Sequence, residues 1–244
     1  MTRIVRAAAH VHSEWSHDAS WTLPEIAAAF TKRRYDVVLL SDHSGHFAAA
    51  DWDGYVAACA AASTDKILLV PGIEYNDEDN VVHVPVWGDL PFFGQQPDIA
   101  TLLGKVHAED GISVIAHPWR HDAWKRYDPA WAQHLTALEV WNRKYDGLAP
   151  SRSAVELARR DGLREFVSLD FHTSRQFFPL AMALRLPGAP DDAVSRDTVH
   201  GALRSGAFEP MFFSQSALRF LRGPALRTLE TLESARRAVR RLLR

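Results

Sequence analysis

The stretch AHVHSEWSHD, residues 9–18, ends a short apolar run and begins a series of polar side chains. Residues 4–9 read as a strand, and two histidines, His10 and His12, stand two positions apart at its end. In an extended strand, side chains two positions apart point to the same face. The spacing therefore predicts that both imidazoles reach one point in space, as they do when a strand end binds a metal ion.

The same pattern recurs along the chain, because other strand-like apolar runs also end in His, Asp or Glu. These runs with their polar ends lie at residues 37–43, 67–74, 114–118, 137–139 and 166–172. Helical segments separate them, and such an alternation favours a parallel sheet with helical crossovers. In parallel barrels, functional residues gather at the carboxyl ends of the strands. The recurrence therefore predicts an α/β fold whose strand ends share one site.

Start and stop signals place the individual elements. Thr22 is positioned to cap a helix over residues 23–30, and Glu25 follows it by three residues. Further strands are expected at 37–40, 67–70, 81–86, 112–116, 137–141, 166–169 and 180–186, and helices at 51–62, 99–109, 129–135, 151–160 and 193–204. A basic amphipathic helix at about 224–243 is expected to pack on the barrel through Leu226, Leu229 and Leu232, with its arginines in solvent.

Composition narrows the class of protein. The chain has 244 residues, 47% of them hydrophobic, and no long linker, so one domain over 1–244 is expected. The formal net charge of -2 favours neither nucleic acid nor a membrane surface as a partner, and no apolar run has the length of a membrane span. The single cysteine, Cys59, and the lack of a signal-peptide core fit a reducing cytoplasm. Nothing in the sequence specifies an oligomeric state.

Nine side chains at or near the strand ends are candidate metal ligands. They are His10, His12, Asp18, His43, Glu74, His83, His117, Asp170 and His172. The set offers nitrogen and oxygen but no sulfur, which suits zinc, manganese or iron. Nine ligands are too many for one tetrahedral ion, but they suit two or three ions that share a bridging carboxylate. Glu74 and Asp170 are the candidates for that bridging and catalytic role.

Two or more ions at roughly 3.5–4 Å from one another are the usual means of hydrolysing phosphate esters, with a metal-bound hydroxide as the nucleophile. Such a site needs no serine or cysteine nucleophile. The chain has no G-x-S-x-G motif, and Cys59 lies away from every motif. The ligand set therefore favours phosphoester hydrolysis over acyl-enzyme chemistry.

Taken in order, the motifs resemble the PHP (polymerase and histidinol phosphatase) family. The resemblance rests on HVHS at 10–13, SDH at 41–43, GIE at 72–74, HP at 117–118 and DFH at 170–172, and it spans about residues 9–173. It implies a distorted (β/α)7, TIM-like barrel with two or three metal ions at the carboxyl ends of the strands. It also implies phosphoesterase activity, which in the family includes histidinol-phosphate phosphatase, nucleotide phosphoesterase and exonuclease variants. Carried over position by position, it assigns all nine ligands, with Glu74 as the bridging carboxylate.

Several assignments stay open at this point. His17 competes with Asp18 for one ligand position, because many members of the family place the acid one residue earlier, and we prefer Asp18. His83 lies in an alternating apolar run and is either a ligand or an ordinary strand residue. Glu139 and Asp42 can each orient a ligand histidine or pair with another group.

A phosphate group needs cations in addition to the metal ions. Arg120 follows the HP motif by two residues, Arg175 follows the last motif by three, and the segment after residue 139 adds Arg143 and Lys144. Guanidinium groups bind phosphate oxygens through two parallel hydrogen bonds. We therefore predict Arg120 and Arg175 as the substrate-binding residues.

The sequence thus predicts a metal-dependent phosphoesterase that acts on a small organic phosphate, such as a sugar phosphate, a nucleotide or a histidinol-phosphate-like compound. Three alternatives stay open: a nuclease acting on nucleic-acid ends, a metal hydrolase of C–N or C–O bonds, and a non-catalytic metal-binding module that serves a partner. The chain has no net positive charge, which disfavours the nuclease. The near-complete ligand set disfavours the non-catalytic metal-binding module.

Overall fold

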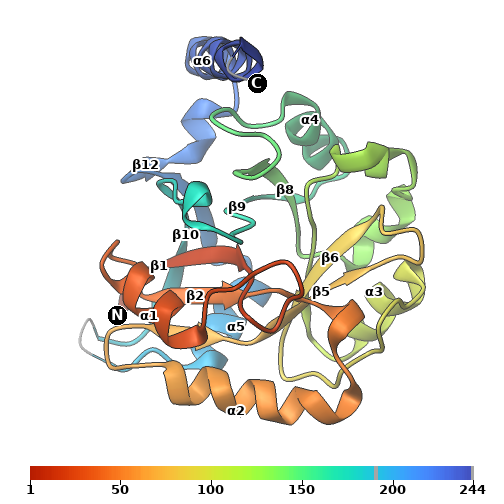
Figure 1. Cartoon of the computed structure of the whole chain (residues 1–244), viewed down its shortest axis with the longest axis vertical. Helices are drawn as coiled ribbons and strands as arrows, with labels where there is room; N and C mark the ends of the chain where they lie inside the picture. Colours follow the sequence, from red (N-terminus) through yellow and green to blue (C-terminus); the bar gives the residue numbers. More distant parts are fainter. Residues whose placement is uncertain (190–191, 243–244) are drawn as a thin grey trace.

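Two six-stranded sheets form the centre of the computed structural model, which describes residues 1–189 and 192–242 (Figure 1). The strands are β1 (Thr2–Val11), β2 (Val37–Leu40), β3 (Asp42–His43), β4 (Leu68–Val70), β5 (Gly72–Asn76), β6 (His83–Trp87), β7 (Ile112–Ile115), β8 (Ala137–Asn142), β9 (Arg164–Ser168), β10 (Leu180–Pro187), β11 (Phe208–Phe212) and β12 (Gln215–Ser216). The α-helices are α1 (Leu23–Thr31), α2 (Trp52–Ala62), α3 (Ile99–Ala108), α4 (Arg152–Arg160), α5 (Arg196–Arg204) and α6 (Gly223–Leu242).

Most predicted elements are present at nearly the predicted bounds. The segment 129–135 is a short 3-10 helix (Pro129–His134), and the short strands β11 and β12 have no counterpart among the predictions. The predicted C-terminal helix at 224–243 is α6, and residue 243 lies outside the described residues. The short strand β3 and the buried strand β5 also have no counterpart, so apolar periodicity located most of the buried elements but not all of them.

The sheets are mixed, so the expectation of an all-parallel sheet is wrong. The first sheet has the order β12-β11-β10-β1-β2-β4 and the second has the order β3-β5-β6-β7-β8-β9. β1, β2 and β4 pair in parallel, as do β7, β8 and β9. β6 is antiparallel to both of its neighbours, and β10 is antiparallel to β1 and β11. The connection 77–82 between β5 and β6 is too short for a parallel crossover, which needs about a dozen residues.

A closed barrel is not confirmed, because the described strands divide into two sheets. The sheets are nevertheless joined along two sides. β2 passes through Ser41 into β3, and β4 passes through Pro71 into β5, so two strands continue from the first sheet into the second. On the other side, the backbone N–H of Phe171, just after β9, donates to the carbonyl of His10 in β1 at 2.9 Å. The strand ends of both sheets therefore meet at one edge.

The strand ends that carry ligands have unusual backbone geometry. His10, His117 and Asp170 have positive φ angles of 59°, 27° and 48°. The pairing of β1 with β2 shifts by one residue between Ala9 and Val11, which is a β-bulge at His10. The two histidines of the opening motif do lie together, with ring centroids 5.1 Å apart, but through this bulge rather than through regular strand alternation. Left-handed non-glycine residues cluster at functional sites.

Gly72 opens β5 because Trp87 packs directly against it. A Cβ at Gly72 would lie 2.3 Å from the Trp87 ring and 2.5 Å from the Leu40 carbonyl oxygen. The Trp87 Nε1–H donates to that carbonyl at 2.7 Å from a fully buried position. This close packing sets the position of β5, and with it the position of Glu74 two residues later.

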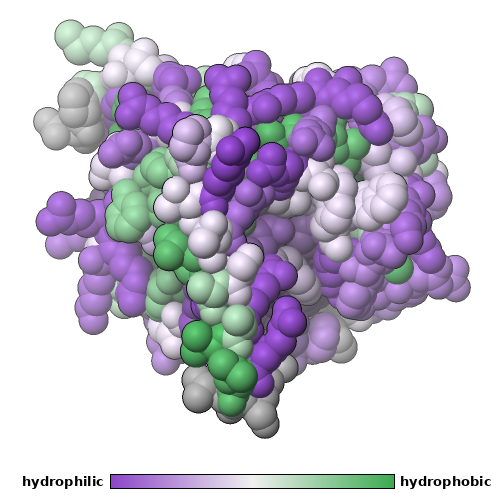
Figure 2. Space-filling view, turned by 90° about the horizontal axis from the view of Figure 1, so that it is seen from above, coloured by the Kyte–Doolittle hydropathy of each residue, from purple (hydrophilic) through white to green (hydrophobic). Residues whose placement is uncertain are grey.

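The apolar stripe of the C-terminal helix α6 packs on the fold only at its start, so the predicted packing of Leu232 is wrong. Leu226 is buried and Leu229 packs against the core, whereas Leu232 and Val239 are 51% and 54% exposed. The helix lies at one end of the molecule, beyond the sheets (Figure 1). Figure 2 views the molecule from that end and shows hydrophobic side chains beside a row of hydrophilic ones. No described helix, α6 included, has the length and hydrophobicity that a membrane span requires.

The capping box predicted at the start of α1 is present and provides a test of local stability. The Glu25 N–H donates to Thr22 Oγ1 at 3.3 Å, and the Thr22 N–H donates to Glu25 Oε2 at 2.9 Å. We expect Thr22→Ala to lower the free energy of unfolding by about 1 kcal/mol, because a first-turn N–H loses its acceptor. Urea denaturation measures the change, with Thr228→Ala at an exposed position inside α6 as the control. Equal losses in the two variants would contradict the role of the cap.

Candidate metal centre

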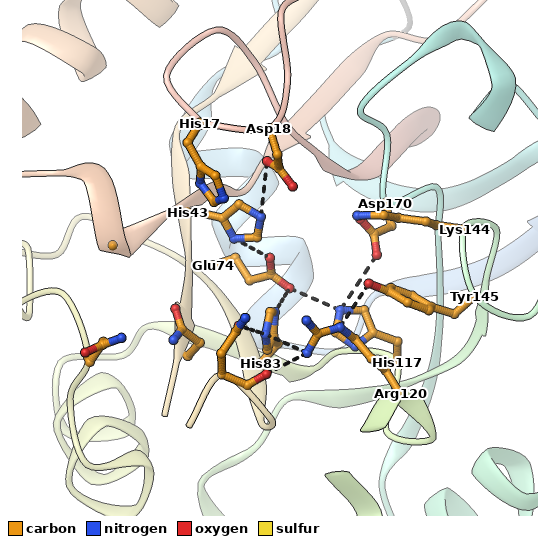
Figure 3. Close-up of a pocket in the computed structure, with 14 residues that line it drawn as sticks. His17, Asp18, His43, Glu74, His83, His117, Arg120, Lys144, Tyr145 and Asp170 are labelled. Carbon is orange, nitrogen blue, oxygen red and sulfur yellow. Dashed lines mark hydrogen bonds and ion pairs between the residues drawn. The ribbon is translucent and has the colours of Figure 1, made fainter. Parts of the chain in front are cut away.

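All nine predicted ligands lie together at the edge where the strand ends meet. Their ligand atoms form four overlapping groups, and within each group the atoms lie within 4.8 Å of one another. The groups are His12, Asp18, His43 and His172; His10, His117 and Asp170; His10, His12 and Glu74; and His43, Glu74 and His83. The overlap means that the groups form one cluster rather than separate sites. Figure 3 shows part of it, with Glu74 between His43, His83 and His117.

Glu74 stands at the centre of the cluster and is 1% exposed. Five imidazole nitrogens surround its carboxylate at 2.9–3.6 Å: His10, His83 and His117 at Oε1, and His43 and His12 at Oε2. Burial alone would raise the pKa of Glu74, but the surrounding imidazoles hold it well below its usual range. A carboxylate with separate sets of nitrogens at its two oxygens is suited to bridge two ions.

Asp170 is the second buried carboxylate of the cluster. Its Oδ1 lies 3.3 Å from both Lys144 Nζ and His172 Nδ1. Its Oδ2 lies 3.7 Å from His117 Nε2 and accepts a hydrogen bond from Asn142 Nδ2 at 3.2 Å. Burial would raise the pKa of Asp170, but the positive groups around it hold the pKa far below the usual range. Both carboxylates are therefore ionised while buried.

His83 reaches the cluster from a strand that runs in the opposite direction. It opens β6, which is antiparallel to β5, so the start of β6 lies at the same edge as the ends of the parallel strands. Its Nδ1 lies 2.9 Å from Glu74 Oε1, and its Nε2 lies 2.6 Å from Asn80 Oδ1. The geometry favours the ligand interpretation of His83 over that of an ordinary strand residue.

Of the two competing residues after β1, Asp18 belongs to one of the four ligand groups. Asp18 Oδ2 lies 2.9 Å from His172 Nε2, and Oδ1 lies 3.5 Å from His43 Nε2. His17 lies beside them, with its ring centroid 5.4 Å from that of His43, and it lines the same cavity. The burial of Asp18 would raise its pKa, but hydrogen bonds with the two imidazoles lower it strongly. The geometry therefore favours an acid at this position.

Glu139 accepts hydrogen bonds from two of the histidines and so fixes their positions. Its Oε1 accepts from His10 Nδ1–H at 2.8 Å, and its Oε2 accepts from the backbone N–H of His117 at 2.9 Å. Asn142 Nδ2 donates to the same Oε2 at 2.8 Å. A carboxylate on Nδ1 directs Nε2 of His10 toward the cluster and makes that nitrogen a better ligand.

Asp42 acts on the loop after β1 rather than on the neighbouring imidazole. Its carboxylate accepts from Ser13 N–H, Ser16 Oγ–H and Tyr55 O–H, each at 2.7 Å. Ser16 Oγ in turn accepts from the backbone N–H of His43 at 3.0 Å. Burial raises the pKa of Asp42, although these hydrogen bonds oppose the rise. Asp42 therefore fixes the turn that leads to Asp18.

The unpartnered nitrogens test whether this cluster fits metal ions. His10 Nε2, His12 Nε2 and His117 Nδ1 are buried and have no hydrogen-bond partner of acceptable geometry among the described residues. Buried polar atoms without partners are rare, and a bound metal ion would satisfy nitrogens of this kind. Burial would lower the pKa of His43, but Glu74 and Asp18 raise it to about 10, so positive charge is favoured there. The donor set and the charge both fit divalent cations.

A cavity of about 300 Å³ opens onto the cluster, and further polar side chains line it. Arg120 Nε–H donates to Tyr145 Oη at 2.9 Å, and Nη1–H donates to the Asn80 carbonyl at 2.8 Å. Lys144 Nζ lies between Asp170 and His172, 3.0 Å from His172 Nε2. Figure 3 shows Arg120, Lys144 and Tyr145 on one side of the cavity.

One of the two predicted phosphate-binding arginines is not at the cavity. Arg120 lines it, but Arg175 is exposed and is absent from the described lining residues. Thr173 caps a 3-10 turn at 174–176, which turns the chain away from the cluster. Lys144 takes the place that the sequence analysis gave to Arg175. It lies two residues after the end of β8, and this closeness to a strand end is the sequence feature that could have identified it.

Comparison with known proteins reveals structural likeness without sequence likeness. No family model matches the chain, and no curated protein matches it. PsfC from Pseudomonas syringae matches with a TM-score of 0.63 and 15% identity, over 97% of this chain and 99% of PsfC. The lesion-specific endonuclease PfuEndoQ from Pyrococcus furiosus matches with a TM-score of 0.61 and 15% identity, over 86% of this chain and 58% of that chain.

A protein from Bifidobacterium adolescentis, provisionally assigned as a metal-dependent phosphoesterase, matches with a TM-score of 0.50 and 17% identity. The match covers 81% of this chain and 95% of that chain. At such identities the likeness establishes a common fold, and the reaction has to be argued from the site itself.

The contact between Glu139 and His10 provides a test of the cluster. Glu139→Gln keeps the size of the side chain but leaves one oxygen to serve both the imidazole and the backbone N–H. We expect metal affinity to fall roughly 10- to 100-fold, the usual effect of losing a group that orients a ligand. Titration of the metal-free protein with Zn²⁺ or Mn²⁺ measures the change, and Glu156→Gln on the exposed face of α4 is the control. Unchanged affinity in Glu139→Gln would reject this role.

Proposed function

We propose that the protein is a metal-dependent phosphoesterase of the PHP type that releases phosphate from a small organic phosphate. One observation carries the proposal: a buried carboxylate, Glu74, has imidazoles of separate ligand groups at its two oxygens, beside a second buried carboxylate, Asp170. Divalent ions held there, when bound, would activate water as the nucleophile and neutralise charge on the phosphoryl group. Two or three ions of zinc, manganese or iron suit the nine nitrogen and oxygen ligands.

The proposal includes the distorted (β/α)7 barrel of that family. β2 continues into β3 and β4 into β5, and Val11 forms a parallel bridge with Phe171. When each interrupted strand is counted once, β1, β2–β3, β4–β5, β6, β7, β8 and β9 support a ring of seven. We also propose a cytoplasmic location, which rests on the single, buried Cys59.

The chain's own residues would orient the substrate. Arg120 is held by Tyr145 and the Asn80 carbonyl through Nε and Nη1, and its Nη2 makes no hydrogen bond to the described residues. That N–H group is available to a phosphate oxygen. Lys144 supplies a second positive charge; its burial would lower its pKa, but Asp170 and other anionic neighbours raise it. Two cations beside the cluster suit a phosphate monoester, which carries two negative charges.

A small substrate fits the cavity better than a nucleic acid does. The cavity of about 300 Å³ has Tyr145 as its aromatic side chain apart from histidines, whereas single strands bind to rows of stacking aromatic side chains in long basic grooves. The formal net charge of -2 points the same way. A nuclease would bind more weakly as salt rises, so salt-independent turnover supports the small substrate.

The proposed activity can be tested by phosphate release. The protein loaded separately with Zn²⁺, Mn²⁺ or Fe²⁺ is expected to hydrolyse at least one compound among sugar phosphates, nucleotides and histidinol phosphate. His12→Ala should lose both this activity and most of the bound metal, because His12 belongs to two ligand groups. His107→Ala on the exposed face of α3 is the control. Full activity in His12→Ala would reject the site, and turnover of amides or lactones alone would establish a C–N or C–O hydrolase.

The two predicted arginines provide a second test. Arg120→Ala should lower kcat/KM roughly 10- to 100-fold, because one or two charge-assisted hydrogen bonds to phosphate are lost. Arg175→Ala should leave kcat/KM within about twofold, because Arg175 lies away from the cavity. Steady-state kinetics on the best substrate of the screen measure both values. Equal losses in the two variants would show that the cavity is not the place where phosphate binds.

A further inference from the structure

The loop between β8 and α4, residues 143–150, carries two of the polar side chains of the cavity. Lys144 lies against Asp170, and Tyr145 holds Arg120 and packs its ring 4.7 Å from that of His117. We call this segment the β8–α4 loop. Because Lys144 and Tyr145 are consecutive residues of one loop, the backbone position of the loop sets the position of both.

The side of the loop that faces the cluster is held by Asn142, the last residue of β8. Its Oδ1 accepts from the backbone N–H groups of Lys144 and Tyr145 at 3.0 and 3.2 Å. Asp146 Oδ2 accepts from the backbone N–H of Asn142 at 2.7 Å. These bonds hold residues 144–146, and the Gly147 carbonyl accepts from Trp141 Nε1–H of β8 at 3.2 Å.

The helix α6 contacts the loop from the other side, at Gly147 and Leu148, and Glu233 is the central contact. Glu233 is 5% exposed, and its Oε2 accepts from the backbone N–H of Leu148 at 2.9 Å. Gly147 has a φ of 79°, and a Cβ there would lie 2.5 Å from both carboxylate oxygens of Glu233. The loop backbone therefore lies directly on the carboxylate, and no side chain fits between them.

Two arginines complete this contact. Arg236 and Arg237 pair with Glu233 Oε1 at 2.5 and 2.6 Å. Arg237 Nη2–H also donates to the carbonyls of Tyr145 and Asp146 at 3.3 and 3.4 Å. One glutamate and one arginine of α6 thus reach three backbone groups of the loop. The opposite charges of Glu233 and Arg237 match the N–H and carbonyl groups that they contact.

We propose that α6 is a positioning element of the active site, in which Glu233 and Arg237 hold the β8–α4 loop so that Lys144 and Tyr145 face the bound phosphate. No residue of α6 is among the described residues that line the cavity, so the effect passes through the loop. The inference rests on the proposed function, because Lys144 and Tyr145 meet a substrate only if this cavity is the active site. It also explains why a carboxylate is buried on a helix whose second half is otherwise exposed.

The test compares Glu233→Ala with a control on the same helix. Glu230 pairs with Arg152 at the start of α4, at 2.7 Å, and does not contact the loop. Glu233→Ala should raise KM for the phosphate ester roughly tenfold, the scale of one charge-assisted hydrogen bond, with a smaller change in kcat and unchanged metal content. Glu230→Ala should change none of these. Glu233→Gln keeps an acceptor for Leu148 N–H and should fall between Glu233→Ala and the unmodified protein.

Hydrogen–deuterium exchange locates the effect without a substrate. In Glu233→Ala, peptides that cover 143–149 should exchange at least about fivefold faster, because backbone N–H protection depends on local opening. In Glu230→Ala, faster exchange should be confined to the start of α4. Gly147→Ala perturbs the same contact from the loop side and should reproduce both the KM and the exchange result. Arg237→Gln serves as the milder variant if Glu233→Ala does not fold.

The outcomes separate this inference from the proposed function. If the unmodified protein hydrolyses no phosphate ester, the proposed function fails, while the exchange data still show whether α6 holds the loop. If the unmodified protein is active and Glu233→Ala matches it in KM and in exchange over 143–149, the inference is overturned. A purely structural contact would behave differently. It would lower kcat, metal content and folding stability equally in Glu233→Ala, Arg237→Gln and Gly147→Ala and leave KM unchanged, and that result overturns the inference as well.

Discussion

The carboxylate of Glu74 is the group around which the rest of the structure is arranged. A carboxylate that is 1% exposed is strongly disfavoured unless its charge is compensated. Here the compensation comes from five imidazoles that arrive from different parts of the chain. Each imidazole nitrogen must lie within about 3–4 Å of the carboxylate to compensate its charge. Apolar side chains in a core need no such exact placement.

The local irregularities of the fold follow from this requirement. The bulge at His10 and the left-handed backbone at His117 and Asp170 occur where a regular strand would carry the side chain past the centre. The packing of Trp87 on Gly72 fixes β5, and Glu139 sets the direction of the His10 ring. Strained backbone and buried charge are both costly, and the surrounding packed strands keep them in place.

The side chains that surround the ligand cluster depend on contacts with α6, near the C-terminus. Asn142 connects the ligand Asp170 to the β8–α4 loop, and Glu233 connects that loop to α6. In our proposal this short series of hydrogen bonds lets α6, which does not line the cavity, act on the side chains that do. In this view the exposed end of α6 extends a helix in which Glu233 and Arg237 already hold the β8–α4 loop.

Most strand and helix positions and the nine candidate ligands could be read from the sequence, because apolar periodicity and ligand-type residues at the ends of apolar runs are local signals. The direction of β6, the choice of Lys144 over Arg175 and the contact of Glu233 with the loop could not, because they depend on how distant segments meet. Arg120 and Arg175 each follow a candidate ligand histidine by three residues, yet only Arg120 lines the cavity, and Arg175 lies in a turn that Thr173 caps. The sequence by itself determined which side chains are candidate metal ligands. The tertiary structure decided which of them lie around one carboxylate, because distances of a few ångströms arise only when the strands pack.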